Sequence, residues 1–424
     1  MFAKGGIPEC RLFVVGRCQF IVAFEMERQV FDLLWPLFGF GRYLGFFPCK
    51  RIVDPETCEN QLKPINWKIQ LILFIIFGGA FCQIGVISYQ LILQSNVEEA
   101  NIFDCMETIN PAISGSFVDK LALYVMPTVA AVVPYLAHWG NYKMRKGLCL
   151  LSQKCMRRSS LSDRRILKPF LAYFAITAIF CISASLITFY TLSVCFQSIA
   201  LLVRLMVSFG SFFAPIMMHY SYVVFLGAFL EVALLVIDNC EKLKSIKYDH
   251  QLTSYIDIAE SLEIASNMFQ FNNFYVVTSN SIQIMVLLYI IIYHLVVNLE
   301  TMSESLVFFL LFDTLTFFTN TLLLCFINFY SHKVAKEIHG LRRHLKASTL
   351  HDNLGLIDFD GKQLPASLVK SCIEERLDEF RGFDGKGYFI LGKSFLKTLI
   401  AFCFTYLVIL IQFKMNESPY HDND

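Results

Sequence analysis

Long apolar stretches alternate with polar segments along most of the chain. A transmembrane helix needs about 20 mainly apolar residues, because hydrocarbon offers a backbone polar group no partner outside its own helix. Seven stretches of the chain meet this requirement. They run approximately over residues 68–93, 121–139, 170–190, 205–237, 274–298, 305–330 and 393–413. The pattern therefore predicts an all-α membrane protein with seven transmembrane helices.

The N-terminal segment, residues 1–67, lacks an apolar stretch of the kind that predicts a span. Its apolar region from Arg11 to Phe47 is interrupted by several charged residues, so a span there would place charges in lipid. Arg17 splits the only short apolar run and no small-residue cleavage site follows, which argues against a signal peptide. We interpret this segment as cytosolic and amphipathic, with Met1 and Met26 both open as the start of translation.

Basic residues collect on one set of loops. Most of the 36 Lys and Arg residues lie in residues 1–67, 140–168, 238–273 and 331–392. Loops that stay in the cytoplasm carry the excess of Lys and Arg, so we predict a cytoplasmic N-terminus. With an odd number of spans, the tail from 414 to 424 is then extracellular. This orientation is the reverse of that of a G-protein-coupled receptor.

The last cytosolic segment, residues 331–392, is too long for a simple turn. Apolar residues recur at helical spacing in 332–350 and again in 368–380, and turn-forming residues lie between them. We expect two helices here, and helical extensions over 238–273, which together form a bundle that joins subunits. Solvated amphipathic loops are the alternative.

Composition narrows the class of protein. Hydrophobic residues make up 55% of the chain and charged residues only 17%, which excludes a soluble enzyme, a disordered chain and a nucleic-acid-binding protein. The 14 cysteines contain no CxxC pair, and the nine histidines form no HExxH set. We therefore predict no catalytic residues, no metal site and no cofactor. Cys105 and Cys195 lie in predicted outer loops, so a disulfide between them is open.

The last span carries polar residues at helical spacing. Thr405, Ile409 and Gln412 are separated by four and three residues, so they share one face of the helix. Four copies around an axis would form a ring of Gln412 above a ring of Ile409, which gives a polar constriction and a gate. A single glutamine reaching from the membrane edge to water is the other interpretation.

The segment Thr405 to Phe413 resembles the TYxxxxxQF signature of insect gustatory receptors. Upstream, the Gly385-Lys-Gly387-Tyr-Phe389 sequence is similar to that family's junction between its last cytosolic helix and its pore helix. We read Gly385 and Gly387 as a hinge, because no strand precedes them as a phosphate loop would require. The rest of the chain matches the family in architecture and not in motif.

The resemblance implies a tetrameric, ligand-gated, non-selective cation channel in the plasma membrane of a chemosensory neuron. The seventh span would line the pore, with Thr405, Ile409, Gln412 and Phe413 facing it and Tyr406 packing behind. The ligand would be a small-molecule tastant, and the other partners are membrane lipid and three identical or related subunits, with no nucleic acid. A receptor that signals through a G protein and a membrane transporter are the alternatives.

The resemblance also places a tastant pocket in the outer half of each subunit, within residues 68–330. Asp313 is an intramembrane carboxylate and must face a cavity or a partner. Tyr289 and Tyr293 lie one helical turn apart and form either a shelf for a ligand or ordinary packing. The candidate pocket residues are Tyr124, Tyr190, Gln283, Tyr289, Tyr293 and Asp313. Whether the tastant is apolar and bitter or a sugar stays open.

Overall fold

The structure is a computed structural model of the 424-residue chain. It describes residues 28–29, 34–43, 47, 49–53, 60–65, 117–153, 157–158, 168–179, 182–183, 201–245, 251–297, 304–347, 356–357, 363–364 and 366–417. The predicted first span, 68–93, lies outside the described residues, as do Cys105 and Cys195.

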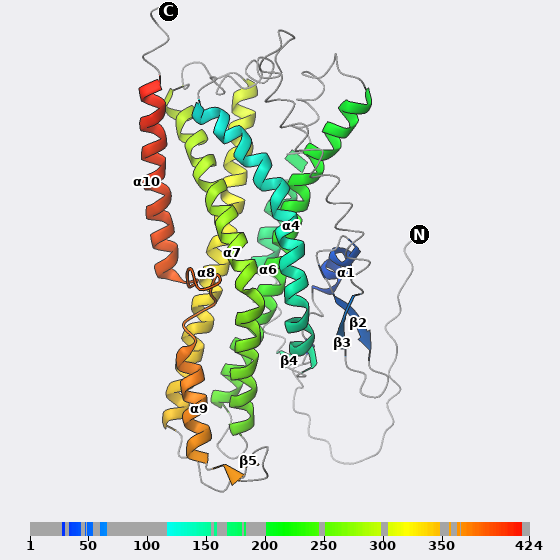
Figure 1. Cartoon of the computed structure of the whole chain (residues 1–424), viewed down its shortest axis with the longest axis vertical. Helices are drawn as coiled ribbons and strands as arrows, with labels where there is room; N and C mark the ends of the chain where they lie inside the picture. The colour runs from blue at the N-terminus through cyan, green and yellow to red at the C-terminus, as the bar shows by residue number, and fades with distance from the viewer. Residues whose placement is uncertain are drawn as a thin grey trace, which may run out of the picture.

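Long helices running side by side form the molecule (Figure 1). Their bounds are α4 Phe117–Gln153, α6 Leu201–Ser245, α7 Gln251–Val297, α8 Glu304–Ala347 and α10 Lys393–Glu417, with the shorter helices α1 Trp35–Tyr43 and α9 Ala366–Glu379. A further apolar helix covers Lys168–Ile179. Among the described residues, four helices are long and apolar enough to cross a membrane, and they lie in α6, α7, α8 and α10.

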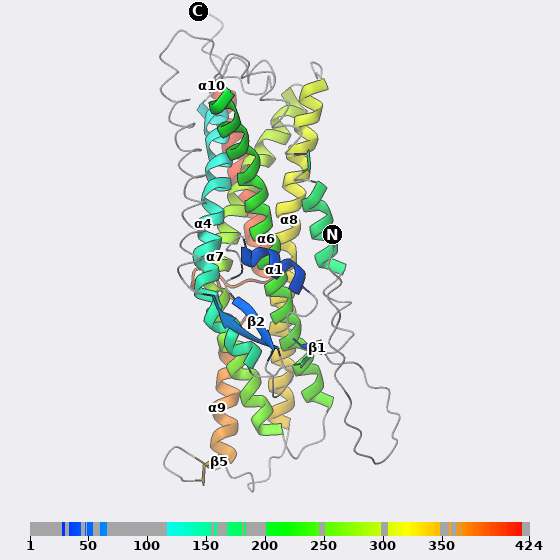
Figure 2. The ribbon, with the colours of Figure 1, turned by 90° about the vertical axis from the view of Figure 1, so that its right-hand side faces the viewer.

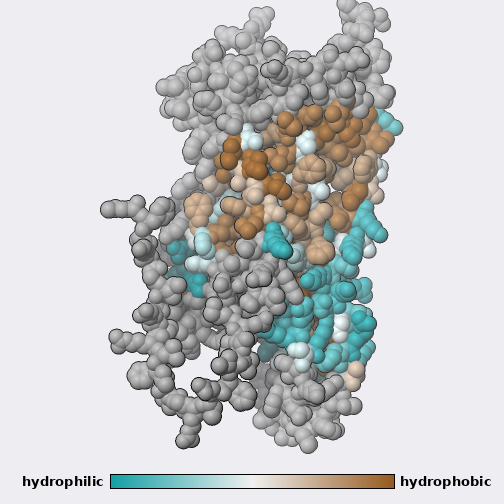
Figure 3. Space-filling view, turned by 180° about the vertical axis from the view of Figure 1, so that it is seen from behind, coloured by the Kyte–Doolittle hydropathy of each residue, from teal (hydrophilic) through white to brown (hydrophobic). Residues whose placement is uncertain are grey.

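The helices extend well beyond the predicted spans, because the hydrophobic pattern marks only their apolar part. Hydrophobic side chains gather over the upper part of the described surface and hydrophilic ones over the lower part (Figure 3). In the polar part, Lys244 of α6 forms an ion pair with Glu337 of α8 at 2.7 Å. Tyr255 of α7 lies 2.9 Å from Nδ1 of His344 on α8. The polar extensions of α6, α7 and α8 therefore pack into one bundle. The helix predicted around 368–380 is observed as α9, and it packs on α7 and α8.

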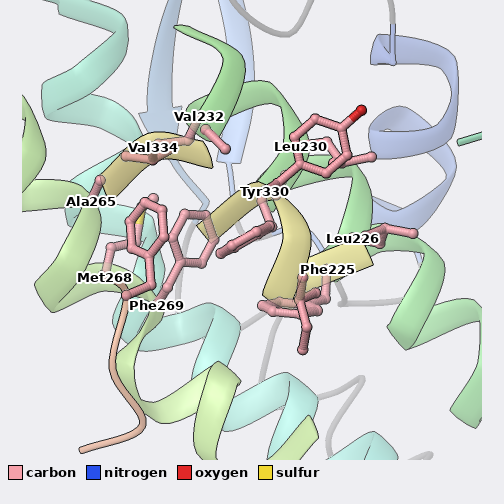
Figure 4. Close-up of a cluster of buried hydrophobic side chains, with 14 of the residues drawn as sticks. Phe225, Leu226, Leu230, Val232, Ala265, Met268, Phe269, Tyr330 and Val334 are labelled. Atoms are coloured by element: carbon pink, nitrogen blue, oxygen red, sulfur yellow. The ribbon is translucent and has the colours of Figure 1, made fainter. Parts of the chain in front are cut away.

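The core lies where α6, α7 and α8 meet. From Ser221 to Ile237 every α6 side chain is buried, because this helix is apolar all round and has neighbours on every side. The ring of Phe269 packs edge to face with those of Phe225 and Phe229. Phe229 and Phe269 also contact Phe383, which follows α9. Part of this cluster is drawn in Figure 4.

Among the described residues, three short antiparallel strand pairs accompany the helices. They are β1 Arg28–Gln29 with β4 Arg157–Arg158, β2 Cys49–Val53 with β3 Asn60–Pro64, and β5 Leu356–Ile357 with β6 Gln363–Leu364. In β2, Cys49 is buried with its Sγ 3.8 Å from that of Cys149 on α4.

The helix α1 lies against the bundle at α6 (Figure 2). Tyr220 of α6 donates a hydrogen bond to the carbonyl of Leu37 at 2.9 Å. Phe38 stacks on Phe47 with 4.4 Å between ring centroids. The described part of the N-terminal segment is therefore folded onto the bundle.

Candidate pore helix and ligand pocket

A tight turn precedes the candidate pore helix. Asp384 pairs with Ile390 across it, and the backbone N–H of Gly385 donates to the carbonyl of Phe389 at 2.9 Å. The carboxylate of Asp384 accepts the N–H of Gly387 at 2.9 Å. Lys386 and Gly387 have φ values of 53° and 78°, in the left-handed region that a turn of this kind requires. We call residues 380–392 the junction turn.

The two glycines have separate roles in the junction turn. A Cβ on Gly385 would lie 2.3 Å from the ring of Phe389, so no larger residue fits without moving that ring. Gly387 has open space around it, and its positive φ is the reason for glycine there. The geometry of the turn thus accounts for glycine at both positions. The hinge motion that we assigned to them stays a prediction.

Side chains of α7 and α8 hold the junction turn in place. Ser331 accepts the N–H of Phe383 at 3.1 Å and donates to the carbonyl of Leu391 at 3.0 Å. The amide oxygen of Asn328 accepts the N–H of Gly392 at 2.9 Å, and Asn273 donates to the carbonyl of Asp384 at 3.0 Å. The base of α10 is thereby tied to two long helices.

Among the described residues, one stripe of α10 packs against the other helices. Cys403 and Leu407 are buried, and Leu407 packs with Tyr289 of α7. In the figure α10 stands at one side of the bundle (Figure 1). Much of the remaining surface of this apolar helix is exposed, which leaves it available to lipid or to other subunits.

The four candidate pore residues all lie outside the packed core. Thr405, Gln412 and Phe413 are exposed, and so is Ile409. The hydroxyl of Thr405 donates to the carbonyl of Ala401 in its own helix at 2.9 Å. They are therefore available to a neighbouring subunit or to a water-filled path.

Tyr406 is partly exposed on α10 in the single chain. Its side chain is 44% exposed and its ring lies 4.4 Å from that of Phe402 on the same helix. The stripe formed by Cys403 and Leu407 makes the contact with α7, and the packing of Tyr406 behind a pore face stays a prediction.

Gln283, a candidate pocket residue, belongs to a buried polar network across three helices. It donates to the hydroxyl of Tyr222 on α6 at 3.3 Å and accepts from Asn320 on α8 at 2.9 Å. Tyr222 also lies 2.8 Å from the hydroxyl of Ser279. The helices α6, α7 and α8 each contribute a polar side chain to this network, and its hydrogen bonds link the three helices inside an apolar core.

Sequence reasoning missed Tyr222, Ser279 and Asn320. The spacing of Ser279 and Gln283, one helical turn apart within an apolar span, was a signal for one polar face on α7. Their partners on α6 and α8 could not be singled out, because Tyr222 and Asn320 each lie among several other polar residues of their own spans.

Of the candidate pocket residues, the structure brings Tyr289 and Tyr293 together. Their rings stack with 6.0 Å between centroids and an interplanar angle of 20°. Tyr289 is 1% exposed and Tyr293 is half-buried. Asp313 is a half-buried residue of α8. The side chain of Tyr124, in α4, and all of Tyr190 lie outside the described residues.

Solved structures with the same fold exist. The chain is similar to the insect olfactory receptor OR5 from Machilis hrabei in complex with eugenol, with a TM-score of 0.61 and 12% identity over 90% of this chain and 98% of that one. The structure of OR5 alone gives a TM-score of 0.60 and 12% identity over 89% and 97%. No protein-family model and no curated protein matches the chain. The likeness confirms the predicted fold class, an all-α membrane protein on the seven-helix plan.

Proposed function

We propose that this chain is a subunit of a ligand-gated cation channel of the gustatory type. The observation that carries the proposal is the exposure of the polar and apolar candidate pore residues on α10. This apolar helix packs along one stripe, while Thr405, Ile409 and Gln412 lie on its uncovered surface. A fold shared with an insect olfactory receptor, together with the TYxxxxxQF segment, supports this assignment.

The channel is a tetramer in this proposal, with identical subunits as the first choice and related receptors as the alternative. Four copies of α10 would surround one axis. A ring of neutral Gln412 amides lets cations pass without strong selection, and a ring of Ile409 closes the path by excluding water. Phe413 would narrow the outer end, and Tyr406 would be covered by an adjacent subunit.

The receptor lies in the plasma membrane with its N-terminus in the cytoplasm. The distribution of Lys and Arg supports this orientation. The folded extensions of α6, α7 and α8 with α9 then form a cytosolic bundle suited to joining subunits.

The ligand is a small-molecule tastant bound in the outer half of the bundle. Tyr293 and Asp313 are half-buried and so remain available to a ligand, whereas Tyr289 and Gln283 are fully packed. Tyr289 contacts Leu407 of α10, so it lies between the proposed pocket and the proposed pore helix. A ligand gates the channel only if it binds the open arrangement more tightly than the closed one.

The test is whole-cell current from cells that express this chain alone, challenged with sugars, bitter compounds and eugenol. We expect a cation current that persists when G-protein signalling is inhibited. Gln412→Ala should change ion permeability or pore block. Gln270→Ala is the matched control, because Gln270 lies on α7 and hydrogen-bonds Asn267 in its own helix.

Each result discriminates between the proposals. A current that depends on G-protein activity would support a coupled receptor instead. A current whose permeability and block are the same in wild type and Gln412→Ala would remove Gln412 from the pore. A current that appears only when a related receptor is co-expressed would replace the homotetramer with a heterotetramer.

A further inference from the structure

Two lysines and two aromatic rings meet where α4, α7 and the junction turn converge. Nζ of Lys143 lies 5.3 Å from the ring centroid of Trp139 and 5.2 Å from that of Phe271. Nζ of Lys386, from the junction turn, lies 4.9 Å from the same Phe271 ring. All three distances fall within cation–π range. We call these four residues the lysine–aromatic patch.

The patch is built by close packing of backbone elements. Gly140 permits the approach of α4 to α7, since a Cβ there would lie 1.8 Å from the amide oxygen of Asn272. Asn272 also donates to the side chain of Asn141 at 3.2 Å. On the other side, Asn273 donates to the backbone of Asp384 in the junction turn. The two lysines are thus brought together by contacts beside them and not by a contact between them.

The position of the patch along the membrane follows from the sequence. Trp139 ends one predicted span, Phe271 precedes the start of another at 274, and Lys386 precedes the span that starts at 393. All three residues therefore lie at the same depth in the membrane, near the cytoplasmic boundary of the hydrocarbon. Indole rings and lysines concentrate at this level, where lipid headgroups begin.

The patch carries positive charge that the described part of the chain does not neutralise. None of the ion pairs found among the described residues includes Lys143 or Lys386. The nearest acidic residue in the sequence, Asp384, directs one carboxylate oxygen to the N–H of Gly387, and its other oxygen is buried. Lys386 also keeps a φ of 53°, an unfavourable conformation for a lysine.

The patch is exposed on α4 and on the junction turn. Trp139 is 55% exposed, and Lys143 and Lys386 are exposed. Tyr388, two residues beyond Lys386, is 77% exposed and lies against Phe274. An exposed aromatic surface at headgroup depth, with two lysines that form no ion pair among the described residues, fits a molecule that has an acyl tail and an anionic head.

We propose that the lysine–aromatic patch binds the headgroup of an anionic phospholipid of the cytoplasmic leaflet. The lipid phosphate or carboxylate lies between the ammonium groups of Lys143 and Lys386, and the acyl chains run along the rings of Trp139 and Tyr388. The bound lipid bridges α4 and the junction turn at the base of α10. This site is separate from the proposed tastant pocket; it rests on the proposed membrane orientation but not on the channel proposal.

The test uses the purified full-length protein in phosphatidylcholine vesicles that contain either brominated phosphatidylserine or brominated phosphatidylcholine. Bromine quenches tryptophan fluorescence at short range, so Trp139 reports the lipid at the patch. We expect stronger quenching by the brominated phosphatidylserine. A lysine near an anionic lipid surface favours binding by about fivefold, so Lys143→Gln with Lys386→Gln should remove most of the preference.

Two further variants make the result specific. Lys336→Gln, an exposed lysine of α8, should keep the preference if it arises at the patch. Trp139→Phe should lose the phosphatidylserine-dependent quenching, because it removes the tryptophan of the patch. Equal quenching by both lipids in the wild type would overturn the proposal. So would a preference that survives in the double lysine variant, when that variant elutes as the wild type does in size-exclusion chromatography.

Discussion

The helices α6 and α10 are both apolar enough to cross a membrane, yet they have opposite surroundings. In the most apolar stretch of α6, 94% of the residues are buried inside the chain, whereas in that of α10 only 11% are. Tyr222 of α6 has its hydroxyl bonded to α7. Gln412 of α10 is exposed.

The difference teaches that hydropathy identifies a membrane helix but not its neighbours. Lipid tails are as apolar as leucine side chains, so a span gains little from burial and is positioned by packing and hydrogen bonds. The helix α6 has these contacts within its own chain. The helix α10 has them at its base and along one stripe, which leaves the rest of its surface for other molecules.

The largest expected effect is on the packing of α6. Phe229→Ala removes a fully buried ring that contacts Phe269 and Phe383, so we expect a loss of about 3 kcal/mol in stability. Phe404→Ala on α10 removes a ring that is exposed in the single chain and should cost well under half as much. Thermal unfolding of the detergent-solubilised protein measures both. Equal losses would contradict the contrast between the helices.

The second prediction concerns the base of α10. Gly385→Ala places a Cβ against Phe389, whose ring stacks on Phe395 of α10 at 4.6 Å, so the helix must shift. We expect a destabilisation of about 1–3 kcal/mol and an altered ligand-evoked current at normal surface expression. Gly392→Ala is the matched control, because nothing lies within 4 Å of its Cβ position. A wild-type current in Gly385→Ala would show that the turn adapts without moving α10.

The third prediction tests the polar network that links α6, α7 and α8. Asn320→Leu removes the donor to Gln283 and leaves a buried amide oxygen without it. We expect a loss of about 1 kcal/mol, as for other hydrogen bonds between membrane helices. Asn267→Leu, at an exposed position of α7, should change stability less. Comparison of the two melting temperatures decides whether the network stabilises the bundle.

The smallest effect concerns thiol chemistry away from the membrane. The hydrogen bond with Cys149, together with burial, raises the pKa of Cys49 above the usual 9.0. The thiolate is the reactive form of a cysteine, so the raised pKa and the burial of Cys49 both protect it from alkylation in the folded chain. At pH 8, N-ethylmaleimide should label the exposed Cys372 and leave Cys49 unmodified until the chain unfolds. Mass spectrometry of the labelled peptides measures this, and rapid labelling of Cys49 in the folded protein would contradict it.

Much of the fold followed from the sequence, since apolar runs such as 205–237 and 274–298 identify their helices directly. The continuation of α4 through 140–153 did not, because this polar stretch is helical through contacts such as that of Gly147 with Met268. In the candidate site, the spacing of Thr405 and Gln412 predicts a pore face, and this stays a prediction because most of α10 is exposed in the single chain. The links from Gln283 to Tyr222 and Asn320 join different spans, and no local pattern encodes which spans are adjacent.

The junction turn fixes α10 at its base. Above the base, most side chains of this helix are exposed in the single chain. The hydrogen bonds of the turn to Ser331, Asn328 and Asn273 are all within or before Gly392, so the clamp that they form lies below the first helical turn. At 1.5 Å per residue, Gln412 lies about 28 Å from this clamp. A rotation of about 5° at the clamp would carry Gln412 sideways by about 2.5 Å over that length, roughly the size of a water molecule. If the packing of Leu407 on α7 yields, a small rearrangement between α7 and α8 would therefore become a larger displacement at the far end of the helix.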